Sequence, residues 1–454
     1  MNNLYPLKEK TESVCPVCLD RIPASRVILG KDVYLHKKCP EHGVFDTIIW
    51  RGEPSFETWR VDKIHTHPTV PFTDVNAGCP CDCGPCADHL QNPCCVLLEV
   101  TQRCDLKCPV CFADSNDIPT IDPEIKEIKN WFDRLLETKT SLNIQLSGGE
   151  PCVRDDLPEI IAFGRQAGFT YFQLNTNGLR LAKDKKFLKD LKEAGLSSVF
   201  LQFDGISDRV YRTIRGKPLL ELKERAIKNC IEVGVGVVLV PVIIPGINDE
   251  EIGGILDFAL KYHPGVRGIH FQPISYFGRF PKAPADKDRI TIPEIIRKLE
   301  EQSQGLIKKE HFKPAQAEHA RCTFSGNFVV MPDGTIRPLT RFQKSNCGCQ
   351  PVMADQALLK GQSFVARTWS RQPIRADQKD LSIDGFGEWD LFIERSRTHS
   401  FAISGMAFQD AWTLDLERLC QCKIFILSPD QRLIPFCAYN LTNMHGESLY
   451  RGHC

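Results

Sequence analysis

Three cysteines, Cys104, Cys108 and Cys111, form the pattern C-x3-C-x2-C directly after an apolar run that extends from Cys95 to Val100. Thiolates at such spacings bind zinc or an iron–sulfur cluster. A structural zinc site is closed by four protein ligands, whereas three cysteines on a cubane of four irons leave one iron open to an exogenous ligand. The spacing alone leaves both alternatives open, so position and neighbouring motifs have to separate them.

A second motif, SGGEP at 147–151, ends the next apolar run at 142–147. Two adjacent glycines, Gly148 and Gly149, allow the backbone to approach a ligand closely, and Glu150 with the following proline stiffens the turn. A Gly-Gly pair by itself indicates no more than a tight loop. Its place one strand after the three cysteines makes the combination specific.

The length and charge of the chain limit which functions are open. The chain has 454 residues, 42% of them hydrophobic, and its formal net charge is zero. This length indicates two or three domains, and a neutral chain without a basic stripe gives no indication of nucleic-acid binding. The first residues lack the apolar core of a signal peptide, and no apolar run is long enough to span a bilayer. We therefore expect a cytoplasmic protein without a transmembrane segment.

The 21 cysteines are unevenly distributed along the chain. Nine lie in the first 95 residues, three in the opening pattern, two in the middle and seven from Cys322 onward. Cytosolic thiols are kept reduced and the count is odd, so metal or iron–sulfur ligation is favoured over disulfides. Two cysteine-rich flanks thus enclose a cysteine-poor centre, and we expect domains at 1–92, 93–315 and 316–454.

The centre alternates between apolar, β-rich runs and amphipathic segments. The six expected strands are 96–101, 142–147, 170–175, 198–203, 235–243 and 268–273. Strand–helix units in series imply an α/β fold with a parallel sheet, and the short helices favour an open or partial barrel. Active sites of such folds lie at the carboxyl ends of the strands. The residues that we expect around this mouth are Cys104, Gly148, Asn175, Asp204, Pro245 and Gln272.

With these motifs, the chain from about 96 to 279 resembles the radical S-adenosylmethionine (SAM) superfamily. The resemblance implies a partial (β/α)6, TIM-like barrel in which Cys104, Cys108 and Cys111 hold a catalytic 4Fe-4S cluster. SAM would chelate the open iron through its amino and carboxylate groups. One electron from the cluster would then cleave SAM to methionine and a 5′-deoxyadenosyl radical, which abstracts hydrogen from an inert carbon.

The same resemblance assigns further residues to the binding of SAM. Gly148, Gly149 and Glu150 are expected at the methionine amino group. Phe112 is expected near the adenine, with an ordinary core ring as an equal alternative. The other expected contacts come from NTNG, LQFDG and the segment 240–249 that would cradle adenine, namely Asn175, Asn177, Gln202, Asp204 and Pro245. For NTNG the alternative is a simple turn, because Asn-Gly is a common turn pair.

The cysteine-rich flanks resemble the archaeal tetraether lipid synthase group and its bacterial relatives, which include proteins described as radical SAM methylases of a pterin precursor. This resemblance implies two auxiliary 4Fe-4S clusters and a rubredoxin-like mononuclear iron. For the mononuclear site we pair Cys15 and Cys18 with a second pair, and zinc is the alternative metal because four thiolates suit both. The candidate second pairs are Cys83/Cys86 and Cys39/Cys79. The histidines expected to be surface or core residues instead of substitute ligands are His42, His65, His67 and His89.

In the C-terminal flank, Cys322, Cys422 and Cys437 match the pattern of the family for an auxiliary cluster. The chain departs from that pattern in SGMAFQD, where a cysteine is expected in place of Gly405 and a histidine in place of Ala407. Either another thiol replaces the lost ligand, or this cluster is altered or absent.

The additional cysteine, Cys420, is our candidate for that replacement. Residues two apart on a strand share a face, so Cys420 and Cys422 are predicted to bind one cluster together. Cys347, Cys349 and Cys454 have no assigned role.

Three functions remain open: coupling of lipid alkyl chains, radical C-methylation of a small heterocycle such as a pterin precursor, and non-enzymatic metal binding. Coupling needs a radical generator, a hydrophobic channel and an auxiliary cluster near the substrate, whereas a polar pocket would serve for methylation of a heterocycle. We favour coupling or a related alkyl-chain reaction, with peripheral membrane contact, because the resemblance spans both flanks. A flavodoxin or ferredoxin is the expected electron donor, since the electron has to come from outside.

Overall fold

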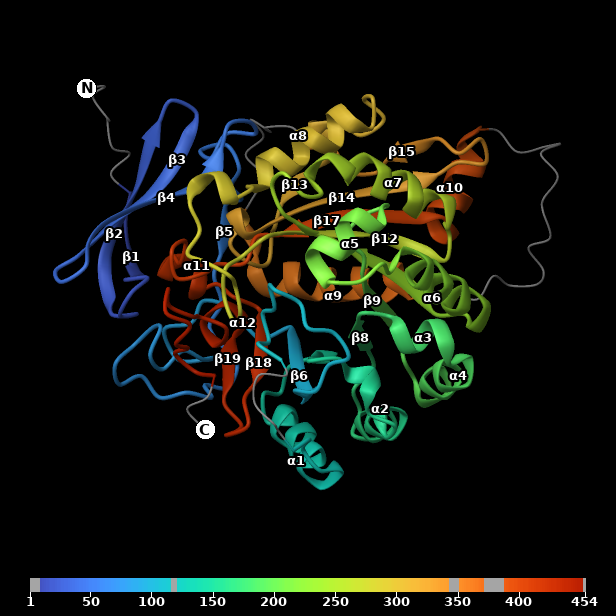
Figure 1. The fold of residues 1–454 in the computed structure, drawn as a ribbon, viewed down its shortest axis with the longest axis horizontal. Helices are drawn as coiled ribbons and strands as arrows, with labels where there is room; N and C mark the ends of the chain where they lie inside the picture. The colour runs from blue at the N-terminus through green and yellow to red at the C-terminus, as the bar shows by residue number, and fades with distance from the viewer. Residues whose placement is uncertain (1–8, 116–120, 343–350, 371–387, 452–454) are drawn as a thin grey trace.

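The computed structural model describes residues 9–115, 121–342, 351–370 and 388–451 (Figure 1). The centre of the molecule is a sheet in which six parallel strands lie side by side in chain order. These strands are β6 (Cys95–Thr101), β7 (Asn143–Gly148), β8 (Phe172–Thr176), β9 (Ser198–Gln202), β10 (Gly236–Val240) and β12 (Val266–Pro273). The expected α/β partial barrel is therefore confirmed. The run at 235–243 divides at Pro241, after which β11 (Val242–Ile243) pairs with β12.

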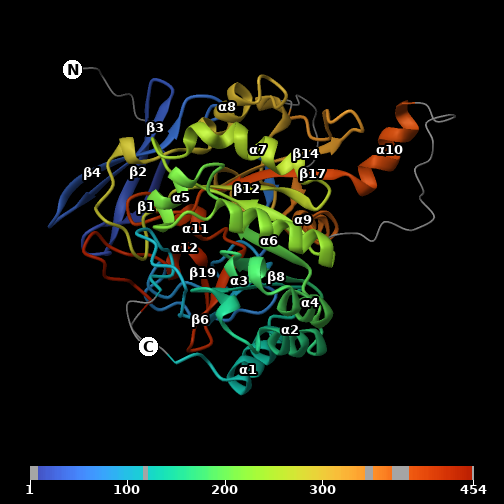
Figure 2. The same ribbon diagram turned by 45° about the vertical axis from the view of Figure 1, so that its right-hand side comes forward.

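Eight helices lie along the outer side of these strands (Figure 2). They are α1 (Ile125–Leu136), α2 (Leu157–Gln166), α3 (Leu179–Lys183), α4 (Lys185–Ala194), α5 (Asp208–Arg215), α6 (Leu220–Val233), α7 (Ile252–Lys261) and α8 (Ile292–Gln302). Each longer helix buries one apolar face, as α1 does with Trp131 and Leu135. Glycines in the left-handed region, such as Gly195 and Gly234, end the helices and turn the chain toward the next strand.

C-terminal residues continue the same sheet at both of its edges. On one side β17 (Ser400–Met406) pairs in parallel with β12, and beyond it lie β14 (Thr323–Val330), β13 (Lys313–Pro314) and β15 (Ile336–Pro338). On the other side β18 (Ile424–Leu427) pairs in parallel with β6 and is followed by β19 (Leu433–Pro435). The sheet thus crosses the expected boundary at 315, and the three domains stay a prediction.

The N-terminal residues form a separate antiparallel sheet of four strands. Its strands are β1 (Glu9–Val14), β2 (Arg21–Leu29), β3 (Asp32–Cys39) and β4 (Gly43–Arg51). The buried guanidinium of Arg26 donates to the Asp415 carboxylate at 2.9 and 2.7 Å, and the buried Lys37 amine donates to the Ala411 carbonyl at 2.6 Å. These contacts fix the N-terminal sheet to the C-terminal segment.

The remaining elements surround the barrel. They are β5 (Lys63–Ile64), β16 (Val352–Met353), α9 (Ala354–Trp369), α10 (Glu388–Thr398), α11 (Leu416–Leu419) and α12 (Phe436–Tyr439). Helix α9 lies at the amino ends of the strands, where the Gln362 amide donates to the carbonyls of Cys94 and Ser141 just before β6 and β7. Among the described helices, none combines the length and the apolar character that crossing a membrane requires.

Candidate active site and metal centres

The loop that carries Cys104, Cys108 and Cys111 follows β6 and is held by the segment after β12. Cys111 and Arg279 exchange two backbone hydrogen bonds of 2.9 Å, and the Arg279 side chain donates to the Cys108 carbonyl at 3.1 Å. A Cβ on Gly278 would lie 2.4 Å from the Cys111 carbonyl oxygen, so only glycine allows this approach. The first and last of the six strands therefore fix the loop together.

The two glycines of SGGEP allow the turn after β7 to pack directly on this loop. Gly149 N–H donates to the Thr101 carbonyl and Glu150 N–H to the Arg103 carbonyl, both at 2.8 Å. A Cβ on Gly148 would lie 2.2 Å from the Thr101 oxygen, and one on Gly149 would lie 2.2 Å from the Arg103 oxygen. The two glycines thus allow a close approach to the cysteine loop, which uses these amide groups, and their expected contact with SAM stays a prediction.

The Glu150 carboxylate connects this turn to the end of β8. It is 2% exposed and accepts hydrogen bonds from the Thr176 hydroxyl at 2.6 Å, the Asn177 N–H at 2.6 Å and the Cys152 N–H at 3.0 Å. Burial raises the pKa of Glu150, while the bonds from Thr176 and Asn177 act in the opposite direction. Its position is therefore set by three donors before any ligand binds.

A buried cation stands next to the cysteine loop. The Arg215 guanidinium donates to both oxygens of Asp204 at 2.7 and 2.9 Å, and it hydrogen-bonds to Cys108. Burial lowers the pKa of Arg215, but the Asp204 carboxylate raises it more, so that the group stays charged. Asp204 itself has no exposed surface and lies behind Arg215.

A cavity of about 940 Å³ extends through the barrel, from the carboxyl ends of the strands to α9 at their amino ends. The expected site residues among its lining are Cys104, Cys108, Cys111, Phe112, Gly148, Gly149, Glu150, Asn175, Asn177 and Gln202. The other two expected SAM contacts, Asp204 and Pro245, are not in the lining, where Arg215 and Ile244 stand instead. The structure thus brings ten of the twelve expected residues to one cavity.

Polar side chains line part of the cavity, and the sequence analysis identified only Gln202 and Gln272 among them. We name this set the polar wall, and its members are Gln145, Gln173, Gln202, His270, Gln272 and Ser404. Parallel strands covered on both faces are normally apolar throughout, so polar residues at alternate positions, as in 143–147 and 171–175, were the available signal. Burial lowers the pKa of His270 to about 4, which leaves a neutral imidazole whose Nδ1 lies 2.9 Å from the Ser404 hydroxyl.

The N-terminal sheet gathers a compact set of metal ligands. The ligand atoms of Cys15, Cys18, Cys39 and His42 all lie within 4.8 Å of one another, at the ends of β1 and β3. The second pair is therefore Cys39 with His42. Cys39 was a proposed ligand, but its pairing with Cys79 and the alternative pair Cys83/Cys86 are wrong. The expectation that His42 is a surface or core residue is wrong as well. Three thiolates and one imidazole are a common zinc set, and the C-x2-H spacing of this pair was a signal for it.

The other histidines behave as expected. His65 and His67 are exposed, and His89 is buried with Nε2 2.7 Å from the Cys422 carbonyl oxygen.

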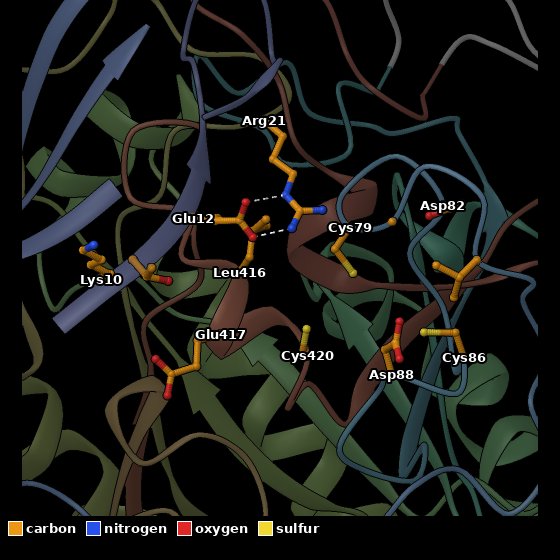
Figure 3. Close-up of a pocket in the computed structure, with 13 residues that line it drawn as sticks. Lys10, Glu12, Arg21, Cys79, Asp82, Cys86, Asp88, Leu416, Glu417 and Cys420 are labelled. Atoms are coloured by element: carbon orange, nitrogen blue, oxygen red, sulfur yellow. Dashed lines mark hydrogen bonds and ion pairs between the residues drawn. The ribbon is translucent and has the colours of Figure 1, made fainter. Parts of the chain in front are cut away.

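A second C-x3-C-x2-C pattern, formed by Cys79, Cys83 and Cys86, meets Cys420 near the surface. Figure 3 shows the sulfurs of Cys79, Cys86 and Cys420 directed toward one shared space. The hydrogen bond with Cys79, together with burial, raises the pKa of the Cys420 thiol, and the charge of Cys420 also acts on Cys83. Cys420 follows α11 and is on no strand, so its predicted pairing with Cys422 is wrong.

Cys322, Cys422 and Cys437 form a third group, located where the two edges of the sheet approach each other. Burial, and then the neighbouring Cys322, raise the pKa of Cys437 to about 12. The Arg418 guanidinium donates to the Cys322 sulfur at 3.4 Å. At Gly405, a Cβ would lie 2.4 Å from the Phe324 ring, so the cysteine expected there has no room. Cys347, Cys349 and Cys454 lie outside the described residues.

The residues at the mouth of the barrel fit the cofactors that the three-cysteine pattern implies. Three thiols on one loop border the cavity and suit a 4Fe-4S cluster with an open iron. Glu150 and Arg215 border the same cavity, so the amino and carboxylate groups of a bound methionine would meet opposite charges. This donor set and the barrel together define a radical SAM protein.

The comparisons with known proteins agree with this class. Residues 98–259 match the family model of the radical SAM superfamily, and residues 7–51 match the HMPTM N-terminal zinc ribbon domain. The chain is 37% identical, over 96% of its length and 94% of the relative, to the 7,8-dihydro-6-hydroxymethylpterin dimethyltransferase of Methanocaldococcus jannaschii. The chain therefore belongs to the radical SAM superfamily, whose 4Fe-4S cluster and SAM are its cofactors, and its N-terminal sheet is a further metal site.

More distant matches cover less of the molecule. A probable GTP 3′,8-cyclase of Archaeoglobus fulgidus is 28% identical over 53% of this chain and 83% of the relative. The crystal structure of Streptococcus suis SuiB bound to S-adenosylmethionine matches with a TM-score of 0.38 and 16% identity, over 48% of this chain and 48% of that one. The matched region is thus about half of the solved chain.

Proposed function

We propose that this protein is a radical SAM methyltransferase acting on a reduced pterin such as 7,8-dihydro-6-hydroxymethylpterin. The long match to a relative named as a dimethyltransferase of that compound supports the substrate class. The methylation of a small heterocycle was the alternative that the sequence analysis kept open.

The observation that carries this proposal is the polar wall. Its amide and imidazole groups line the interior that an acyl or alkyl chain would have to fill. Each buried polar group left without a partner costs about 1–3 kcal/mol, so an alkyl chain is a poor occupant, whereas a pterin ring offers donors and acceptors along its edges. Lipid coupling, which the sequence analysis favoured, has no support from the named relatives.

Aromatic side chains at the same cavity fit a planar ring. Phe200 and His270 stack with centroids 5.7 Å apart, and Trp369 packs on Phe200 at 4.8 Å. Flat ligands gain dispersion and offset-stacking contacts from such surfaces. This arrangement supports a heterocycle of the pterin class.

Each group of cysteines has a separate role in this proposal. Cys104, Cys108 and Cys111 would hold the cluster that, with SAM, supplies a radical able to remove hydrogen from an unactivated carbon. Glu150 and Arg215 would orient the methionine portion of SAM, with Asp204 positioning Arg215. The two remaining thiol groups would hold auxiliary 4Fe-4S clusters, and the set Cys15, Cys18, Cys39 and His42 would hold zinc.

The test is an anaerobic reaction of the reconstituted enzyme with SAM, a low-potential reductant, the dihydropterin and a one-carbon donor, either further SAM or a reduced folate, followed by mass spectrometry. We expect 5′-deoxyadenosine and a pterin heavier by one or two methyl groups, and neither product from Cys108→Ala. Formation of 5′-deoxyadenosine without any change in the pterin would reject the substrate and retain the superfamily chemistry.

A further inference from the structure

Two glutamines of the polar wall, Gln145 and Gln173, form a hydrogen-bonded chain of side-chain amides with Asn175 across two neighbouring strands. The Gln173 amide donates to the Asn175 oxygen at 3.3 Å, and the Asn175 amide donates to the Gln145 oxygen at 3.2 Å. We call Gln145, Asn175 and Gln173 the amide triad. All three border the cavity.

One end of the amide triad lacks a partner. Gln173 has no exposed surface, and its side-chain oxygen accepts no hydrogen bond from any residue within the described ranges. Buried acceptors are almost always satisfied, so an acceptor left in this state beside a cavity indicates a ligand that supplies the donor. The other end, the Gln145 amide nitrogen, has donor capacity to spare because the Gln145 oxygen is the group that binds Asn175.

The two ends of the amide triad are adjacent, and one is always a hydrogen-bond donor while the other is an acceptor. Gln145 and Gln173 are register partners on β7 and β8, so their backbones are separated by about 4.8 Å. If all three amides are turned over together, the chain keeps its hydrogen bonds and the free acceptor and free donor exchange ends. In either state the pair offers one acceptor and one donor.

We propose that Gln145 and Gln173 recognise the lactam edge of the heterocycle, one accepting from its ring N–H and the other donating to its neighbouring carbonyl. This inference rests on the proposed function and specifies which residues select the substrate. The pyrimidinone ring of a pterin has such an edge, with an N–H and a carbonyl on adjacent atoms. Asn175 is a positioning residue, since it ties the two glutamines together.

The experiment compares two ligands on the holoenzyme: the dihydropterin and its analogue methylated on the ring N–H of the lactam. Equilibrium dialysis under anaerobic conditions measures both dissociation constants. We expect the wild-type enzyme to bind the parent compound at least about tenfold more tightly, because the methyl group removes the donor and leaves a buried acceptor unpaired.

Gln173→Leu should lose most of this discrimination and bind the parent compound about tenfold more weakly. Thermal unfolding of Gln173→Leu, compared with the wild-type enzyme, shows whether the barrel is intact. Gln145→Met is a second variant at a half-buried position, and the same loss is expected. The matched control is Gln302→Leu on α8, which removes an amide outside the cavity.

The outcomes separate the two proposals. Wild-type discrimination that persists in both Gln173→Leu and Gln145→Met overturns the assignment of the lactam edge while the pterin remains the substrate. A wild-type holoenzyme that binds neither ligand overturns the proposed function and this inference with it.

Discussion

Two segments of this chain have the same cysteine spacing and very different surroundings. Cys79, Cys83 and Cys86 repeat the C-x3-C-x2-C pattern of Cys104–Cys111 within some twenty residues. The first pattern meets a fourth thiol, Cys420, from the other end of the chain. The second borders the barrel cavity beside Glu150.

This difference teaches that spacing defines a loop able to bind a cluster, while the fold around the loop decides what the cluster can do. Four thiolates close a cubane and suit electron transfer, whereas an open iron binds an exogenous ligand. Buried charges also differ, since Arg215 contacts Cys108 inside the barrel while Arg21, near Cys79, is exposed on the surface. The open pattern is therefore the one that we assign to SAM.

The largest expected effect is at the open pattern. Cys108→Ala removes a direct cluster ligand. Loss of only an outer partner of a metal site lowers activity by up to about 100-fold, so we expect reductive SAM cleavage to fall by more than that factor. Chromatography of 5′-deoxyadenosine measures it. Cys230→Ala, an isolated buried cysteine on α6, is the matched control and should keep activity. Undiminished cleavage by Cys108→Ala would refute the assignment.

A second prediction uses two buried ion pairs of the same kind. Arg215–Asp204 and Arg289–Asp410 each place a fully buried carboxylate against an arginine whose side chain is 6% exposed. Arg215→Gln and Arg289→Gln should each cost about 3–5 kcal/mol of unfolding free energy, because a carboxylate is left buried without its partner.

Only the Arg215 change should also affect the open pattern. We expect SAM affinity or SAM cleavage to fall about 10- to 100-fold in Arg215→Gln, since Arg215 contacts a cluster ligand. Thermal unfolding and SAM binding, measured on both variants, separate the two effects. Equal SAM binding by both variants would mean that Arg215 is only structural.

The barrel could be predicted from sequence because its strands and turns are local signals. Apolar runs followed by polar or glycine residues located all six strands. The Gly148–Gly149 pair was expected to approach a ligand, and its close neighbour is the backbone of the cysteine loop. The partner of that approach, the cysteine loop itself, was not evident, since it depends on how two strands are aligned.

The metal centres were harder to predict because their ligands come from distant parts of the chain. Cys420 lies more than 300 residues from Cys79, and no local pattern links them. By contrast, the C-x2-H spacing of Cys39 and His42 and the repeated cysteine pattern were visible and were not used. Whether a cysteine side chain fits at Gly405 can be judged only from the packing of Phe324 and Phe271 around it.

A third prediction concerns the closed pattern. Cys420→Ala should open its cluster, which Mössbauer spectra would detect as a distinct iron site, and the iron content at Cys322, Cys422 and Cys437 should be unchanged. With a flavodoxin or ferredoxin as donor we expect turnover to fall about tenfold, while a chemical reductant restores it. Cys81→Ala, an exposed cysteine of the same loop, is the control. Unchanged spectra would mean that Cys420 is no ligand.

The smallest effect on SAM cleavage is expected at the zinc ribbon, the site of Cys15, Cys18, Cys39 and His42. Its ligand atoms lie close enough together to hold a single ion, so it is a metal site with which both cysteine patterns can be compared. His42→Cys turns three thiolates and an imidazole into four thiolates, a set that binds zinc equally well, so SAM cleavage should stay within about twofold. His42→Ala leaves three ligands and should release zinc and destabilise the sheet of β1 to β4, which metal analysis and thermal unfolding would follow. Since binding of a structural metal is coupled to folding, the loss should appear in stability before it appears in chemistry. Loss of SAM cleavage in a His42→Ala protein that remained folded would contradict this prediction. The ribbon would then be part of the electron path, as a third kind of metal site beside the closed and the open cysteine patterns.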